Sequence, residues 1–300
     1  MTEQATFTSD VQALSETIRT TFPDFHFSKA TLAMSGDDHI VLIVDDAWVF
    51  RFPRSEEYAR RFLREVKLLK TLRIHTTVPV PEYVYVSEQL RFGGYPMLQG
   101  DPATGLAFER LSRDRQSRFL GSMAQFLTAI HRLPTSLVVS ASGDEDRTPA
   151  WFRRRYLAER RDTLGTLLNA RIADADRFYE KFIELAVAKR TFVHGDLLDR
   201  HMLIDGKGTV TGVIDFGDAA VSDPAYDFGF FWRYGEEAVS QLYERYESKD
   251  DRSLVLRSRY YFMRYVLDEL YFSTLPDNTC TDDQPTLLAL LDRDLSSILT

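Results

Sequence analysis

The pattern of apolar residues changes character near residue 99, and this change limits the folds that the chain can adopt. Before it, runs rich in β-branched and aromatic residues predict strands within 28–52, at 83–88 and at 94–98, with an amphipathic helix over 56–73. Beyond it, helical periodicity dominates. The stretch between the two parts has the glycine and proline content of a linker. We therefore predict an α+β chain with a mixed lobe at 1–98, a hinge or linker at 99–105 and a mainly helical lobe at 106–300.

Local signals place the individual elements. A helix is predicted over 9–21, and residues 40–52 predict a hairpin whose turn is Asp45-Asp46. Within the helical part, short apolar runs separated by turn residues predict a small β-region at 191–215. Long amphipathic helices are predicted over 112–132, 151–170, 174–190, 236–248, 253–273 and 284–299.

Charge is distributed unevenly over the 300 residues, whose net charge is −8. Residues 1–190 contain 27 Lys and Arg against 25 Asp and Glu, a balance of +2, whereas residues 191–300 contain 10 against 20, a balance of −10. Nucleic-acid binding requires clustered Lys and Arg, so we do not expect a nucleic-acid partner. The acidic third instead favours a cationic partner.

Cysteine usage and hydropathy indicate the compartment. Cys280 is the single cysteine, so an internal disulfide is excluded, and no Cys/His cluster has metal-ligand spacing. The first residues lack a basic region followed by an apolar run, and no stretch of about 20 apolar residues occurs. We expect a cytoplasmic protein with no membrane partner and, because no feature requires a dimer, a monomer.

The segments 194–201 and 213–218 carry the most chemical information. Asp196 follows a predicted strand, His201 lies five residues later, and Asp215 ends a nearby predicted strand. An aspartate after a glycine is, by itself, more often a turn residue. Together the three residues have the layout that phosphoryl transfer needs, in which one carboxylate orients the acceptor hydroxyl and two ligands hold magnesium against nucleotide phosphates.

Three stretches also carry a family resemblance. They are Val-His-Gly-Asp at 193–196, Ile-Asp-Phe-Gly-Asp at 214–218 and Ser-Asp-Pro-Ala-Tyr-Asp-Phe at 222–228. They resemble the catalytic, metal-binding and following structural motifs of the aminoglycoside and macrolide antibiotic phosphotransferases, which are small-molecule relatives of protein kinases. The resemblance covers nearly the whole chain, is strongest to aminoglycoside 2″-O-phosphotransferases, and implies a two-lobed protein-kinase-like fold.

The resemblance implies roles for individual residues. Asp196 would orient the acceptor hydroxyl and accept its proton, and His201 and Asp215 would hold magnesium. Arg51 would contact the α- and β-phosphates with Glu65 as its helix partner. Many family members have Lys where Arg51 stands, so a planar fork replaces a point charge here.

The resemblance also implies a site for ATP or GTP as phosphoryl donor. Ser35 lies in the turn expected over the phosphates, which lacks the glycine-rich loop of protein kinases. Tyr95 would take the gatekeeper position beside the nucleobase. Backbone groups near Met97 and Leu98 would pair with the purine edge.

An acceptor site in the acidic third would attract a polycation, which favours an aminoglycoside over a neutral sugar. Asp196 would contact the acceptor. The other candidates are Asp218, Trp232, Glu236, Glu237, Asp268 and Glu269. Arg200 and the short stretch 229–237 depart from the 2″-O-enzymes, and the latter resembles macrolide kinases, whose acceptor is a large monocation.

Two further features are expected to be structural. His131, at the end of a long predicted helix, is predicted to make a structural hydrogen bond. The aromatic run 228–232 is predicted to lie in the lobe core, with Trp232 as the candidate exception.

Together these observations predict a magnesium-dependent antibiotic phosphotransferase. It would move the γ-phosphoryl of ATP or GTP to a hydroxyl of an aminoglycoside, at the 2″ position, and confer resistance. The alternatives are a macrolide 2′-phosphotransferase, a housekeeping kinase of a choline- or homoserine-like alcohol, and a catalytically silent nucleotide-binding module.

Overall fold

The structure is a computed structural model that describes residues 7, 9–33, 38–137, 147–185, 187, 189–247, 251–276, 280 and 282–299. The chain divides into two compact units. The first unit comprises Met1–Ser122, Ser136–Gly143 and Leu198–Ala219. The second unit comprises Met123–Thr135, Asp144–Leu197 and Ala220–Thr300. No helix in the described ranges is both long and apolar enough to cross a bilayer.

The first unit contains a five-stranded antiparallel sheet with the strand order β1-β2-β3-β5-β4. Its strands are β1 (Ala30–Leu32), β2 (His39–Val44), β3 (Trp48–Pro53), β4 (Tyr85–Ser87) and β5 (Phe92–Pro96). Asp45 and Asp46 lie in the three-residue turn 45–47 between β2 and β3 with φ of 50° and 51°, and the Ala47 amide donates to the Val44 carbonyl at 3.0 Å. The predicted acidic hairpin turn is therefore confirmed.

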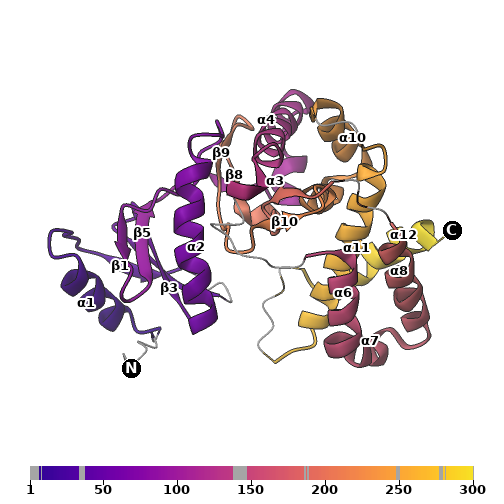
Figure 1. Ribbon diagram of the computed structural model, residues 1–300, viewed down its shortest axis with the longest axis horizontal. Helices are drawn as coiled ribbons and strands as arrows, with labels where there is room; N and C mark the ends of the chain where they lie inside the picture. Colours follow the sequence, from indigo (N-terminus) through magenta and orange to yellow (C-terminus); the bar gives the residue numbers. More distant parts are fainter. Residues whose placement is uncertain are drawn as a thin grey trace. The chain divides into compact units, whose positions relative to one another are not determined.

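Two helices cover opposite faces of this sheet, α1 (Val11–Thr21) and α2 (Glu56–Leu72) (Figure 1). Side chains alternate between the faces of a strand, and β3 shows the consequence. Phe50 and Phe52 are fully buried in the core cluster that includes residues of α1. Arg51, between them, points to the α2 face, where it pairs with Glu65. The alternation thus places one cation under α2 while the flanking rings build the core.

The first unit also contains a three-stranded sheet of order β6-β8-β9. Its strands are β6 (Asp101–Pro102), β8 (Met202–Ile204) and β9 (Val210–Val213). A 3₁₀ turn, Asp199–His201, leads into β8, and the short helix α3 (Gly105–Glu109) follows β6. The helix α4 (Arg113–His131) begins in the first unit and ends in the second. The predicted β-region at 191–215 is therefore present, and its last two strands form a hairpin.

The second unit is mainly helical. Its strands β7 (Thr191–Val193) and β10 (Ala220–Ser222) pair antiparallel. Its helices are α6 (Pro149–Arg155), the π-helical turn Tyr156–Arg160, α7 (Arg161–Leu168), the 3₁₀ turn Asn169–Arg171, α8 (Ile172–Glu184), α9 (Ala225–Gly229), the 3₁₀ turn Phe230–Tyr234, α10 (Glu236–Arg245), α11 (Leu254–Phe272) and α12 (Gln284–Leu299). The core of the unit forms around α11, which packs against α9 and α12.

The predicted fold class is confirmed, since an antiparallel sheet with its helix precedes a mainly helical remainder, as in protein-kinase-like phosphotransferases. Two local predictions differ. The helix predicted over 151–170 is interrupted by the π-helical turn. The strand predicted at 94–98 begins at Phe92, because glycines fit there: a Cβ on Gly94 would lie 2.5 Å from the Phe50 ring. The lobe boundaries at 98 and 106 stay a prediction.

Candidate active site

Arg51 is the centre of a buried ion-pair group in the first unit. Its side chain is buried, and Nη1 donates to both carboxylate oxygens of Glu65 at 2.7 and 2.9 Å. Nη2 donates to Oδ1 of Asp215 at 3.0 Å. One guanidinium therefore joins β3, helix α2 and the loop after β9. The structure brings together three residues that the sequence predicted as parts of one site.

Two further contacts explain why arginine can serve here. Nη2 of Arg51 lies 3.1 Å from Nδ1 of His39, and Nη1 donates to the Tyr83 hydroxyl at 3.4 Å. Because a guanidinium only donates, Nδ1 of His39 must accept. Burial lowers the pKa of His39, as does the adjacent Arg51 charge, so the imidazole is neutral. The planar guanidinium can donate hydrogen bonds to several acceptors at once, whereas a lysine ammonium would reach fewer of them.

The loop after β9 presents Asp215 in an unusual backbone conformation. Its φ is 66°, in the left-handed region that non-glycine residues rarely adopt. The loop is held on both sides of this residue: the Ile214 amide donates to the His201 carbonyl at 2.9 Å, and the Phe216 amide donates to Glu65 Oε1 at 3.4 Å. Oδ2 of Asp215 lies 3.7 Å from Nε2 of His201. The two predicted metal ligands are thus adjacent.

Four carboxyl groups lie near this loop. The carboxyl groups are Asp38, Glu65, Asp215 and Asp218, and the guanidinium groups that pair with them are Arg51 and Arg61. Burial raises the pKa of Asp38 to about 7, and Asp218 and Asp215 add to this effect. Burial also raises the pKa of Glu65, against the opposing effect of Arg51. A bound cation would favour the ionised forms of these carboxyl groups.

The pKa of Asp38 leads to a test by pH. Between about pH 4 and pH 7 the folded protein holds a proton on Asp38 that the unfolded chain releases, so stability falls as pH rises through this range. Asp38→Asn removes this titration. We expect its melting temperature relative to wild type to rise by a few degrees from pH 5 to pH 8 in EDTA.

Thermal unfolding followed by circular dichroism measures this difference. Glu88→Gln, which removes an exposed carboxyl group from the same unit, is the control and should leave the pH profile unchanged. Parallel profiles for wild type and Asp38→Asn would contradict a raised pKa at Asp38.

In the second unit, the loop that carries Asp196 is anchored by Asp227. Oδ2 of Asp227 accepts from the His194 amide at 2.8 Å, and Oδ1 accepts from the Gly195 amide at 2.9 Å. Oδ2 also contacts Nε2 of His131 at 3.1 Å. Gly195 has a φ of 79°, which glycine adopts without strain. The backbone immediately before Asp196 is therefore fixed by a buried carboxylate.

His131 extends this anchor. A carboxylate only accepts, so Nε2 of His131 carries the proton that faces Asp227, and Nδ1 lies 2.9 Å from the Tyr246 hydroxyl. All three side chains are buried. The structural hydrogen bond predicted for His131 is confirmed.

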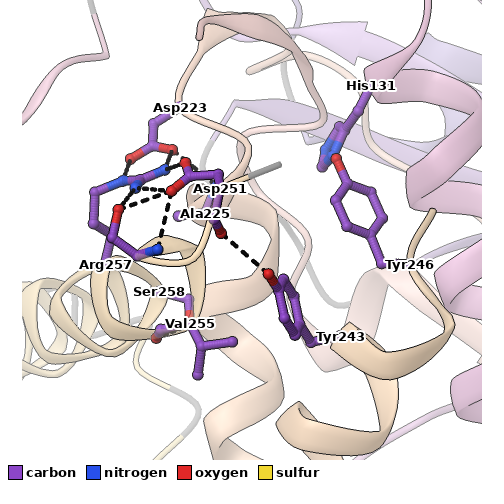
Figure 2. Close-up of polar contacts among 10 residues, drawn as sticks. His131, Asp223, Ala225, Tyr243, Tyr246, Asp251, Val255, Arg257 and Ser258 are labelled. Atoms are coloured by element: carbon purple, nitrogen blue, oxygen red, sulfur yellow. Dashed lines mark hydrogen bonds and ion pairs between the residues drawn. The ribbon is translucent and has the colours of Figure 1, made fainter. Parts of the chain in front are cut away.

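A second buried network lies around Arg257 (Figure 2). The guanidinium is fully buried and donates through Nε and Nη2 to the two carboxylate oxygens of Asp223, each at 2.7 Å. It also donates to both oxygens of Asp251, at 2.6 and 3.1 Å, and to Ser253 Oγ at 2.6 Å. Burial alone would lower the pKa of Arg257, but these bonds to Asp223 and Asp251 raise it. Helix α11 is thereby tied to the segment before α9.

The predicted acceptor residues fall into different environments. Glu236 and Glu237 are exposed in the first turn of α10. Asp268 is buried and pairs with Arg160 and, at 2.5 Å, with Arg264, so its charge is offset. Glu269 is also buried.

The aromatic run 228–232 lies in the core, as predicted, and this includes the candidate exception. Trp232 is only 5% exposed, and its indole N–H donates to Ser258 Oγ at 2.9 Å. Little of its ring is therefore open to a ligand. Asp218 belongs to the first unit, where it pairs with Arg61.

The predicted nucleobase residues lie at the end of β5. Tyr95 is buried and packs edge-to-face on Tyr83. The Met97 amide donates to the Ala47 carbonyl at 2.8 Å, so this amide is already used. Within the described ranges no partner is found for the Leu98 amide, which leaves it as a donor for a nucleobase. Ser35 lies outside the described residues.

Sequence reasoning missed several residues of these networks. His39, Arg61 and Arg257 were not singled out, and no local pattern marks them, because their partners lie far along the chain. Asp223 and Asp227 could have been found, since both stand in the quoted stretch 222–228. Their anchoring roles depend on contacts that only the fold supplies.

Comparison with known structures supports the fold. The chain is 24% identical to the GDP and kanamycin complex of APH(2″)-IIia, covering 95% of this chain and 99% of that one with a TM-score of 0.80. It is 21% identical to the macrolide 2′-phosphotransferase MphH from Brachybacterium faecium, covering 86% and 91% with a TM-score of 0.65. The chain therefore has the fold of these phosphotransferase structures, and Arg51, Glu65 and Asp215 are joined in one ion-pair group within it.

Sequence comparison shows the family. The profile of the phosphotransferase enzyme family matches residues 34–261, and the chain belongs to this family. It is also 30% identical over 247 residues to the uncharacterized protein YcbJ of Bacillus subtilis (strain 168), covering 76% of this chain and 78% of that one. The family resemblance predicted from the sequence is confirmed.

Proposed function

We propose that this phosphotransferase moves the γ-phosphoryl group of ATP or GTP to the 2″-hydroxyl of an aminoglycoside and so confers resistance. The observation that carries the nucleotide part is the Arg51 group. Its guanidinium is buried and oriented by Glu65, with Asp215 on the same fork. Such a fork can pair with phosphate oxygens.

Magnesium would be held by His201 and Asp215. In the described ranges no three His, Cys, Asp or Glu side chains form a ligand set. Two protein ligands suit magnesium, which commonly takes one or two carboxylates and completes its shell with phosphate oxygens and water. The carboxyl groups near Asp215 fit a divalent cation, although His201 is a softer ligand than usual. When bound, the ion would neutralise charge on the β- and γ-phosphates.

Asp196 acts on the acceptor. Its carboxylate accepts a hydrogen bond from the acceptor hydroxyl and takes the proton as the oxygen bonds to the γ-phosphorus. The bond from this phosphorus to the bridging oxygen breaks, and the nucleoside diphosphate leaves. Asp227 fixes the two amides before Asp196 and so limits the positions that its side chain can take. Correct positioning supplies much of the rate in such reactions.

The donor nucleobase would pair with the end of β5. The Leu98 amide, which has no partner among the described residues, supports this role, with Met97 contributing its carbonyl and Tyr95 bounding the site.

An aminoglycoside acceptor is supported by charge. Residues 191–300 have a balance of −10, and Glu236 and Glu237 offer exposed carboxylates for ammonium groups. The other predicted acceptor residues of this unit, Asp268, Glu269 and Trp232, are buried, so the proposal assigns them no contact with the acceptor. The arginine pairs at Asp268 favour a second candidate, a macrolide 2′-phosphotransferase, because they reduce the negative charge available to a polycation.

A nucleotide-turnover assay with magnesium tests the proposal. Purified protein is given ATP or GTP with kanamycin-like aminoglycosides, macrolides, choline or homoserine. We expect turnover to rise at least tenfold with aminoglycosides only, with a phosphorylated product found by mass spectrometry and its position by NMR. Stimulation by macrolides alone would support the second candidate. Tight nucleotide binding without turnover with any acceptor would reject both.

A further inference from the structure

Helix α2 is linked to the loop 215–218 at a second place, one helical turn before Glu65. Nη1 of Arg61 donates to Oδ1 of Asp218 at 2.9 Å, and Nη2 donates to Oε1 of Glu57 at 2.7 Å. Glu57, Arg61 and Glu65 are spaced four residues apart, so they share one face of α2. This face carries the partners of the loop, both at Phe216 and at Asp218.

The geometry of the pair differs from that of a typical surface ion pair. The Arg61 side chain is 16% exposed and that of Asp218 is 27% exposed, so solvent screens the contact only in part. Glu57, whose side chain is 63% exposed, accepts from the second arm of the guanidinium. The Tyr58 ring lies 5.7 Å from the Arg61 guanidinium carbon. Arg61 therefore contacts Glu57 and Tyr58 on α2 in addition to Asp218.

The loop needs such a restraint. Asp215 adopts a left-handed φ, which is unfavourable for a non-glycine residue and persists only when its surroundings impose it. On one side of this residue the hairpin bond from Ile214 to His201 holds the backbone. On the other side the long Phe216 bond of 3.4 Å is weak by itself. The Arg61 pair secures the loop three residues after Asp215.

We propose that Arg61 and Asp218 form a positioning pair that clamps the loop 215–218 to α2 and thereby holds Asp215 in its metal-binding position. This role rests on the proposed function for the metal and nucleotide, and it takes Asp218 away from the acceptor. Asp218 pairs with Arg61 of α2 in the first unit. The guanidinium therefore offsets its charge, which leaves the carboxylate less able to bind an ammonium group of the acceptor.

Hydrogen exchange on the metal-free protein tests the clamp without reference to any ligand. We expect Arg61→Met and Asp218→Asn each to accelerate exchange of the Phe216 amide and its neighbours in 215–219 by about tenfold, while β2 stays unchanged. Arg60→Met removes an exposed charge from the position of α2 that precedes Arg61 and should leave exchange in the loop unchanged. Unchanged exchange in both clamp variants would overturn the proposal.

Nucleotide binding with and without magnesium tests the positioning role. With Mg²⁺ and ATP or GTP, titration calorimetry should show a dissociation constant about five- to tenfold higher in Arg61→Met and in Asp218→Asn. The double variant should match the single ones, because both remove the same interaction. The reversed pair, Arg61→Asp with Asp218→Arg, should recover the affinity to within about twofold of wild type. In EDTA all variants should bind the nucleotide like wild type.

The outcomes separate this proposal from the proposed function. Wild-type binding of Mg²⁺ and nucleotide with unaltered affinity in both clamp variants would overturn the positioning role alone. A higher acceptor KM in Asp218→Asn, with Arg61→Met unaffected, would assign Asp218 to the acceptor instead. Absence of nucleotide binding in the wild-type protein would reject the proposed function and the positioning role with it, while the exchange data would still decide whether the clamp exists.

Discussion

Asp196→Ala is expected to lower the kcat of phosphoryl transfer by about 10³- to 10⁴-fold, the upper range for loss of a positioned proton acceptor. The corresponding increase in the barrier is about 4 to 5.5 kcal/mol. The carboxylate of Asp196 is half-buried on a loop whose preceding amides are fixed by Asp227. We therefore expect no neighbouring side chain to take over the role of proton acceptor in the variant. Nucleotide affinity should stay nearly unchanged, because Arg51, the residue proposed to bind phosphate, lies on β3.

Single-turnover measurements with a responsive acceptor give kcat for the variant, and calorimetry gives its nucleotide affinity. Asp205→Ala is the matched control, since it also removes a carboxylate, but from the exposed turn between β8 and β9. It should retain wild-type turnover. Retained turnover in Asp196→Ala would defeat the assignment of Asp196, whereas loss of nucleotide binding would indicate a structural role for its side chain.

Arg257→Met is expected to destabilise the protein by about 3 to 5 kcal/mol, because removal of one partner leaves buried carboxylates without a counter-charge. Asp223 is almost completely buried, and Asp251 is only 16% exposed on its side chain. Both would lose the guanidinium that now satisfies them. The melting temperature should fall by about 10 °C at neutral pH.

Chemical and thermal unfolding measure the change, and Arg252→Met is the matched control. Arg252 carries the same charge on the exposed segment before α11, and its loss should alter the free energy of unfolding by less than about 0.5 kcal/mol. Adding Asp223→Asn to Arg257→Met should recover part of the stability, because it removes the buried charge left behind. A change below about 1 kcal/mol in Arg257→Met would contradict a stabilising role of this network.

The fold was predictable where local patterns determine it. The amphipathic helix predicted over 56–73 is α2, Glu56–Leu72, and the hairpin 40–52 contains β2 and β3 with the predicted turn. The π-helical turn at Tyr156–Arg160 was not predictable, because the apolar periodicity of this segment continues through it. Helical periodicity reports which face is buried, but it does not report how the backbone hydrogen bonds shift within one turn.

The residues of the predicted site could be selected from the sequence, but their pairing could not. Arg51, Glu65, His201 and Asp215 were selected from sequence, and the structure brings these four together in the first unit. Asp268 was selected as an acid from sequence alone, and its pairing with Arg160 and Arg264 could not be inferred because the three residues are separated by up to 108 positions. A charge count cannot distinguish an available carboxylate from one that is already paired.

By itself the sequence determined the order of strands and helices, the family and the types of residue at the positions proposed to react, since each depends on short-range pattern and spacing. The tertiary structure decided which charges are paired. Arg51 and Asp215 are 164 positions apart, and Arg61 and Asp218 are 157 apart. Ion pairing depends on distance in space and on burial, which the packing of α2 against β3 and the loop after β9 creates. The role of Asp218 therefore changes from a candidate acceptor carboxylate to the partner of Arg61.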